Sequence, residues 1–433
     1  MKHIYVRSVF FMLSFLLILS TRATPLFYRS NYPTTPLANE IKRGKNCDFF
    51  INVSGSAGST TEGRDSTKAK VNFPNIYGNF NMNKVGGNTN LTANLIAAPA
   101  SDPNNHYVKL QNLTPLTGTN NFGHLSFSGK LKHFEVNFNL SRFFRDNLFI
   151  ELNIPVRKLE VKDTAYTDLT PAAGTNGALN QANANWTNFL ASFDDILGLY
   201  SLTKTDVKQT GIGDIELIFG AAHKSRTFDN LEIVCRGGLT IGSGKKKDED
   251  KVFSIANGYD GHSGVTGDLT FLFSPFKSFT LELGGGGTTF FNKTKDLRMV
   301  TDTQQSGFIK LAKGKAERSL GSVWHFESSL IFKPIDKGCS VTLGYSFQGQ
   351  GTTQLFPENQ TTFNVTTANS DAFLKRWHMH NLNISATASG RCREGKRKNW
   401  YAQFFYSRPF KGEYVANLDT FGGCVGMGIT WKF

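Results

Sequence analysis

The chain ends in Cys424-Val-Gly-Met-Gly-Ile-Thr-Trp-Lys-Phe433, where large apolar residues alternate with small or polar ones. We call every second residue of a strand one parity, and the apolar parity of this segment consists of Val425, Met427, Ile429, Trp431 and Phe433. Successive side chains of a β-strand point to opposite faces of the sheet. This period of two therefore predicts a terminal strand with one apolar face and one polar face.

The same alternation recurs along most of the chain. Within residues 130–141, Phe134 and Phe138 alternate with Glu135 and Asn139. Further alternating segments lie at 148–157, 215–219, 231–241, 341–348 and 381–386. A tilted strand needs about 10 residues to cross a bilayer. The expected strands that contain these alternating segments are about that long.

The connections between the expected strands are alternately short and long. We expect strands near 45–58, 129–141, 146–160, 209–222, 228–242, 264–273, 278–291, 319–332, 339–351, 375–389, 398–409 and 418–433. This pattern predicts a closed, antiparallel, up-and-down transmembrane β-barrel of about twelve strands, with long outer loops, short periplasmic turns and both termini on the short-turn side. Closure follows because a bilayer leaves no sheet edge unpaired.

The N-terminus predicts export. Lys2 and Arg7 precede the apolar run Val9–Leu19, and Thr21-Arg22-Ala23 provides small residues for cleavage near Ala23. That run is shorter than the roughly 20 residues of a transmembrane helix, although an N-terminal anchor remains the alternative. We therefore divide the chain into a signal peptide (1–23), a periplasmic segment (24–44) and the barrel (45–433).

The composition excludes several other classes of protein. With 38 Phe, the chain is too aromatic for a disordered tail, and it lacks the Ala/Glu/Lys/Leu/Arg excess of a coiled coil. Its five cysteines are too few for a disulfide scaffold and form no CxxC pair, so a thiolate zinc site has no support. Cys235 and Cys424 fall on opposite faces of their expected strands, so we do not expect a disulfide bond between them. Cys339 and Cys392 lie in or beside short turns at the same end, and a disulfide bond between these two is an open alternative.

Two segments resemble known outer-membrane barrels. The terminal Thr430-Trp-Lys-Phe433 looks like the assembly signal of Gram-negative outer-membrane barrels, with Met427, Ile429, Trp431 and Phe433 on its apolar face. The segment Gly211-Ile-Gly-Asp-Ile-Glu-Leu-Ile-Phe-Gly-Ala-Ala-His223 resembles outer-membrane transporters linked to the phenol meta-pathway. The resemblance implies an outer-membrane location, recognition by the barrel-assembly machinery and solute passage, but no particular substrate.

The polar parity is expected to line the lumen. The candidate lumen residues are Glu135, Glu151, Glu216, Glu232, Glu282, Glu327, Arg157, Arg236, His133 and His325. One hypothesis is an acidic girdle that favours cations in a porin-like channel for small solutes. The other is a salt-bridge network that fills a closed, structural or surface-exposed barrel.

The long loop at 161–208 contains a helical pattern near 185–200. Its apolar residues recur at helical spacing and must be buried, either as a plug or gate or as a loop packed over the rim. The helix residues are Trp186, Phe189, Leu190, Phe193, Ile196 and Leu197.

Signals for enzymes, metals and cofactors are weak. His262 and Ser263 are adjacent, so in a strand they would point to opposite faces and could not form a catalytic pair. His378 and His380 share a parity but have no third ligand at sensible spacing. The basic run Arg391–Lys398 is expected to be a solvated turn, with anionic lipid headgroups or an anionic cell-wall polymer as the alternative counterparts. We therefore expect a non-enzyme without cofactor or metal, whose partner is the lipid bilayer and not nucleic acid.

Overall fold

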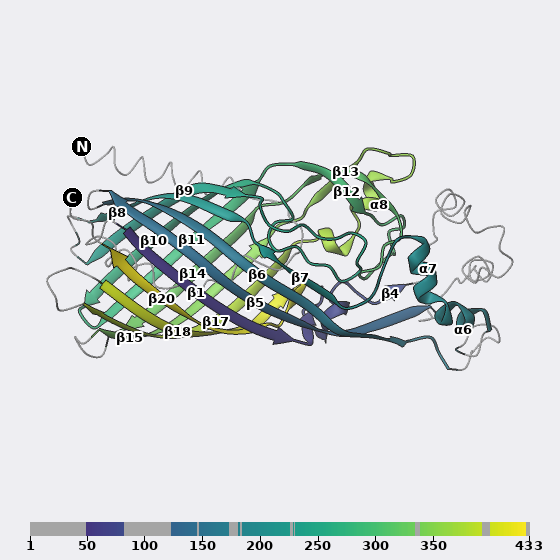
Figure 1. Cartoon of the computed structure of the whole chain (residues 1–433), viewed down its shortest axis with the longest axis horizontal. Helices are drawn as coiled ribbons and strands as arrows, with labels where there is room; N and C mark the ends of the chain where they lie inside the picture. The colour runs from purple at the N-terminus through teal and green to yellow at the C-terminus, as the bar shows by residue number, and fades with distance from the viewer. Residues whose placement is uncertain are drawn as a thin grey trace.

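The computed structural model describes residues 49–81, 123–144, 147–172, 181, 184–225, 228, 230–333, 338–391 and 399–429. Twelve antiparallel strands form the barrel wall (Figure 1). They are β1 Phe49–Thr60, β5 His124–Phe144, β6 Leu148–Asp168, β8 Ile215–Lys224, β9 Leu231–Ile241, β10 Gly264–Phe276, β11 Phe279–Phe290, β14 Val323–Phe332, β15 Cys339–Gln350, β17 Trp377–Arg391, β18 Asn399–Glu413 and β20 Asp419–Ile429.

The strand order closes the sheet on itself. Around the wall it runs β5, β1, β20, β18, β17, β15, β14, β11, β10, β9, β8 and β6, and β6 then pairs with β5. The predicted fold class is therefore confirmed, and each strand of the wall overlaps a predicted segment, although β5 and β6 extend farther towards the long loops than predicted. Among the described residues, no helix is long and apolar enough to cross a membrane.

One expected strand, 209–222, is interrupted. It consists of β7 (Val207–Ile212) and β8, which both pair with β6. Val156 pairs with Ile212 but Asn153 pairs with Glu216, so one extra residue lies on the β7–β8 side. This is a β-bulge, and it falls opposite Pro155, which has no N–H to donate to the ladder.

Large apolar side chains cover the outside of the wall, and mostly polar ones line the inside, apart from buried apolar clusters near the short turns that include Phe50, Phe149 and Tyr401. Phe138 and Phe404 are 47% and 75% exposed, whereas their polar neighbours Asn139 and Gln403 are 8% and 1% exposed. A water-soluble domain shows the opposite arrangement. This is the distribution expected for a barrel with an apolar outer surface and a polar lumen.

Aromatic residues mark both ends of this apolar surface. Towards the long loops, His380 contacts the rings of Tyr345, Phe347 and Phe410. Towards the short turns, the Arg142 guanidinium lies over the rings of Phe49 and Phe144, at 5.3 and 4.9 Å from their centroids. Such girdles are typical of the two interfaces of a membrane.

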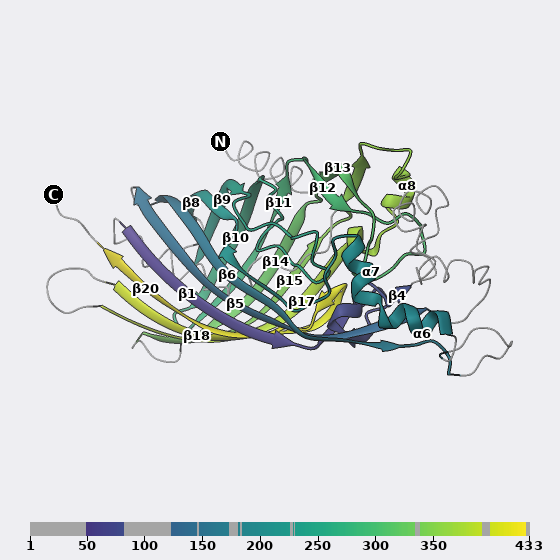
Figure 2. The ribbon, with the colours of Figure 1, turned by 45° about the vertical axis from the view of Figure 1, so that its right-hand side comes forward.

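The long connections fold together into a cap at one end of the barrel (Figures 1 and 2). We call the described parts of these connections, 61–81, 184–206, 242–263, 291–322 and 351–376, the outer cap. It contains the small sheet β12–β13–β16 and the strands β2 and β3 of a second small sheet, whose third strand, β19, comes from the last outer connection. The bounds of its elements, with the short strands next to it, are β2 Glu62–Arg64, β3 Lys70–Asn72, η1 Phe73–Asn75, β4 Phe80–Asn81, α6 Ala184–Ala191, α7 Phe193–Leu199, β12 Lys293–Arg298, β13 Lys313–Ser319, β16 Gln354–Pro357, α8 Val365–Ala368, η3 Ala372–Leu374 and β19 Val415–Ala416.

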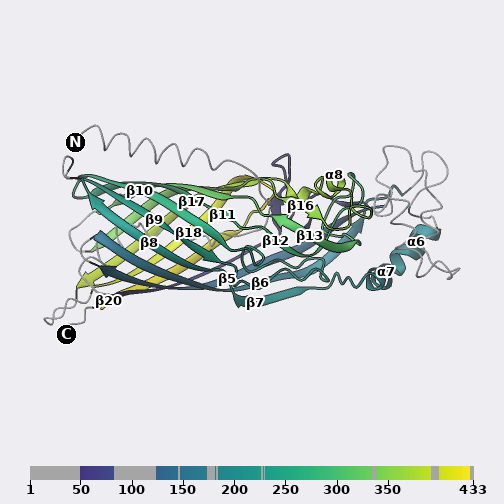
Figure 3. The same ribbon diagram turned by 90° about the horizontal axis from the view of Figure 1, so that it is seen from above.

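The single helix expected near 185–200 is instead two short helices, α6 and α7, separated at Ser192. Asp194 and Asp195 lie in the first turn of α7, where negative charge is favourable. Both helices lie at the cap end of the molecule (Figure 3). The break allows both apolar stripes to face the same core.

Candidate functional site: the lumen and its outer cap

The predicted lumen residues lie on the inward parity of the wall. Glu135, Glu151, Glu232, Glu282, Arg157 and His133 are buried, and Glu216, Glu327, Arg236 and His325 are half-buried. They do not form one cluster, because they are spread over separate strands around the barrel. The structure brings them together in smaller groups.

The first group joins the wall to the cap. Arg157 Nε donates to Glu135 Oε2 at 2.5 Å, and His133 Nε2 lies 3.8 Å from the same oxygen. The guanidinium also donates from Nη1 to the backbone carbonyl of Asn257, at 2.8 Å. Because Asn257 belongs to the outer cap, Arg157 holds that connection against the inner wall.

The second group surrounds Glu151. Asn139 Nδ2 donates to Glu151 Oε1 at 2.5 Å, and Arg236 Nη1 lies 3.8 Å from Oε2. Asn153 donates to Glu216 at 3.4 Å. Both arginines of the predicted set therefore lie beside carboxylates, so part of the lumen is an internal ion-pair network.

A further lumen carboxylate, Asp268, was missed by the sequence analysis. Its Oδ1 lies 2.9 Å from His325 Nε2, across the strand between them. Asp268 shares a parity with Thr266 and Thr270 in an expected strand, so alternation could have identified it. With Asp268, seven inward carboxylates face two inward arginines among these residues, and the set is acidic overall.

The entrance above these residues is covered by apolar side chains. The largest buried core cluster of the described residues includes Leu131 and Leu159 of the wall together with Phe253 of the cap, and Phe308 packs against it. Trp186, Phe189, Phe193, Ile196 and Leu197 of the two helices belong to it, and Leu190 packs at its edge. Trp186 Nε1 also donates to Asp168 Oδ2 at 2.7 Å, at the end of β6. The helices thus pack over the rim at the ends of the long strands.

Buried charges fasten the cap internally. Asp260 forms ion pairs with Lys295 and with Arg318, the latter at 2.7 Å, and its Oδ1 accepts from the backbone N–H of Lys247 at 2.9 Å. Burial alone would raise the pKa of Asp260, but the two cations lower it to about 2. Lys310 and Asp371 form a second buried pair, with the Lys310 ammonium 4.0 Å from the ring centroid of Phe373. No local pattern in the sequence signalled these contacts.

The bulge between β7 and β8 is also tied to the cap. The Asp214 carboxylate accepts from the backbone N–H groups of Gly244 (2.8 Å) and Tyr259. The bulge turns Asp214 towards the β9–β10 connection, where it holds two points of that loop. No local pattern in the sequence indicates this contact.

The candidate catalytic pair is separated. His262 Nδ1 contacts the carbonyl of Phe291 at 3.0 Å, while Ser263 Oγ accepts from the N–H of Gly242 at 3.0 Å. His378 and His380 pack against outward aromatic rings. Among the described residues, no group of three or more His, Cys, Asp or Glu could hold a metal ion.

Several predicted features lie outside the described residues. They are the signal peptide, the segment 24–44, Trp431, Phe433, Cys47, Cys392 and most of the basic run at 391–398. Of the assembly signal, Met427 lies on the outer face, and Ile429 ends β20. Cys424 is buried beside Asn52 and Tyr401, on the inward parity.

No protein-family model matches the sequence, and no curated protein does. Among solved structures, the COG4313 outer membrane channel from Pseudomonas putida F1 is 12% identical, covers 93% of this chain and 99% of that chain, and gives a TM-score of 0.48. The toluene transporter TodX from Pseudomonas putida is 10% identical over 95% of this chain and 96% of its own, with a TM-score of 0.32. A Pseudomonas aeruginosa FadL homologue is 9% identical over 94% and 98%, with a TM-score of 0.29. The resemblance to the phenol meta-pathway type stays a prediction.

Proposed function

We propose that this protein is a channel of the bacterial outer membrane that passes small solutes passively and favours cations. The observation that carries the proposal is a closed wall with an apolar outer surface and an acidic inner one. Confined carboxylates attract cations and repel anions when they outnumber the cationic groups beside them. The excess of inward carboxylates over inward arginines therefore supports a preference for cations over anions.

The proposal includes the route to the membrane. Export would use the predicted signal peptide, with cleavage near Ala23, and the apolar face of the terminal strand would be read by the barrel-assembly machinery. The outer surface, with its two aromatic girdles, is suited to a lipid bilayer. The capped end would face outwards, because the short turns are expected in the periplasm.

A closed barrel without transport is the second candidate. It is favoured by the apolar core across the capped end and by the buried pair of Glu135 and Arg157. In that case the lumen network would only stabilise the wall.

Conductance in planar bilayers separates the two candidates. The purified full chain is expected to conduct. Under a KCl gradient, the sign of its reversal potential should show that K⁺ permeates more readily than Cl⁻. Replacing Glu232, Glu282 and Glu327 by glutamine is expected to lower the cation-to-anion permeability ratio by about 2-fold or more, because three inward charges are lost.

The matched control removes acids outside the lumen. Asp194→Asn with Glu358→Gln changes two exposed cap carboxylates and should leave the ratio unchanged. A folded, inserted barrel that never conducts would support the closed alternative. Anion preference of the unmodified chain would contradict the proposal.

A further inference from the structure

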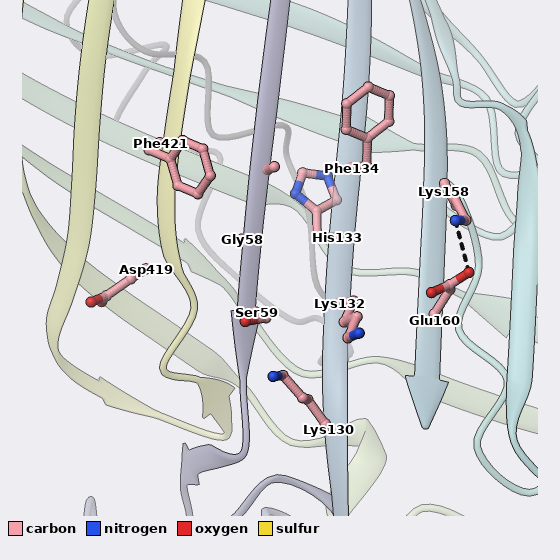
Figure 4. Close-up of a pocket in the computed structure, with 11 residues that line it drawn as sticks. Gly58, Ser59, Lys130, Lys132, His133, Phe134, Lys158, Glu160, Asp419 and Phe421 are labelled. Carbon is pink, nitrogen blue, oxygen red and sulfur yellow. Dashed lines mark ion pairs between the residues drawn. The ribbon is translucent and has the colours of Figure 1, made fainter. Parts of the chain in front are cut away.

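A hollow lies on the outer surface of the wall, over the outer half of β1 (Figure 4). The outward side chains of β1 become small in this half, at Gly55, Ala57 and Ser59. Ala57 pairs with Phe134 on one neighbouring strand and with Phe421 on the other. These two exposed rings stand on either side of the small residues and bound a space of about 520 Å³. That volume is in the range of sites for small ligands.

Lysines gather at the outer end of this hollow. The lysine cluster consists of Lys130 and Lys132 on β5, Lys158 and Lys162 on β6, and Lys208 on β7. Lys130 and Lys162 are directly opposite each other in the β5–β6 ladder. Like charges in that position destabilise a strand pair unless a counter-charge lies between them.

Nearby carboxylates compensate only part of this charge. Glu160 is shared between Lys158 (2.9 Å) and Lys162 (3.4 Å). Asp419 accepts from the Tyr406 hydroxyl at 2.8 Å and lies 3.8 Å from Arg408. Within the described part of the chain, no carboxylate forms an ion pair with Lys130 or Lys132. The surface therefore presents a cationic excess next to an apolar hollow.

The position of the cluster along the strand suggests the occupant. Phe134 is the outermost of the large apolar residues on the outward parity of β5, and Lys132 is the next outward residue beyond it. Consecutive outward residues are separated by about 6.6 Å along a strand. The lysines would thus lie where hydrocarbon gives way to headgroups, on the side of the capped end.

We propose that this outward hollow binds a phosphorylated, multiply acylated glycolipid of the lipid A class. Its phosphates would contact Lys130, Lys132 and Lys158, and an acyl chain would lie over Ala57 between Phe134 and Phe421. The inference rests on the membrane placement given under Proposed function but not on conduction. Charge complementarity selects a lipid with anionic phosphates over one with a zwitterionic headgroup.

The test is a titration of the purified full chain, in detergent micelles, with diphosphoryl lipid A, followed by native mass spectrometry. Lys130→Gln with Lys132→Gln is expected to weaken binding by roughly 25-fold, since each lysine near an anionic lipid surface contributes about 5-fold. Ala57→Trp keeps every charge but fills the hollow, and should also weaken binding. The matched control, Lys224→Gln with Lys277→Gln, removes two exposed lysines at the short-turn end and should change nothing.

Each outcome decides the inference. Equal binding by the unmodified chain and the Lys130/Lys132 variant would overturn it, as would displacement of lipid A by inorganic phosphate at matched phosphate concentration. Folding of every variant is checked by heat-modifiable migration, and conductance is measured on the same preparations. If the chain conducts but does not bind lipid A, only the proposed lipid site is contradicted. If it binds lipid A but does not conduct, only the proposed channel function is contradicted.

Discussion

Replacing Phe138 by arginine is expected to lower the free energy of unfolding of the barrel in lipid vesicles by about 2–4 kcal/mol. Phe138 lies within the run of outward apolar residues of β5, between Phe134 and Leu140. A guanidinium there would have to enter hydrocarbon or distort the bilayer around it. Urea titration of folding into vesicles, followed by tryptophan fluorescence, measures the change.

The control uses the same strand and the same substitution. Ser128 is exposed on the outward parity, beyond the lysines, where an arginine would reach the headgroup region. Ser128→Arg is therefore expected to cost about 0–1 kcal/mol. Equal effects at the two positions would mean that the outward parity has no depth dependence, and would contradict the membrane placement.

The second large effect is expected from Asp260→Asn in the outer cap. The substitution removes the carboxylate that Lys295 and Arg318 share, while both cations remain in a largely buried site. Removing one partner of a buried ion pair costs about 3–5 kcal/mol. Hydrogen exchange at β12 and β13 is expected to accelerate strongly, whereas Asp296→Asn, an exposed position on β12, should have little effect.

The same carboxylate predicts a dependence on pH. The folded pKa of Asp260, about 2, is below its ordinary value of 3.8, so its stabilisation is fully present above about pH 4. It is lost as the pH falls through 2, because the protonated group no longer pairs with the two cations. Opening of the cap in the unmodified chain, measured as exchange relative to the intrinsic rate at each pH, should thus rise between pH 4 and 2. A variant with asparagine at 260 that shows the same rise would assign the effect to other groups, such as Glu249, whose pKa is also lowered by Lys247 and Lys295 against the effect of burial.

The barrel was predictable because alternation records the two environments of each strand. Phe138 and Asn139 are neighbours in sequence but lie on opposite sides of the wall, and such pairs recur in every strand region that the sequence indicated. The lumen residues followed from the same parity, and Asp268 would have followed from it too. The lysine cluster was readable in the same way, since Lys130, Lys132 and Phe134 share a parity.

The cap was not predictable in detail because its contacts join residues far apart in the chain. Arg157 meets the Asn257 carbonyl 100 residues later, and Lys310 meets Asp371 61 residues later. Neither contact produces a repeating pattern in the sequence around its residues. The break at Ser192 is of the same kind, since helical spacing continues through it and only packing against the cap core divides α6 from α7.

The most direct test of the account compares the two parities with spin labels in a lipid bilayer. In a background with all five cysteines replaced, labels are placed at Val53 and Ser54 on β1 and at Leu382 and Asn383 on β17. The ratio of collisions with oxygen to collisions with a water-soluble nickel complex is expected to be high at Val53 and Leu382 and low at Ser54 and Asn383. Equal ratios at neighbouring positions, or the opposite alternation, would contradict an apolar wall in contact with lipid around a polar lumen.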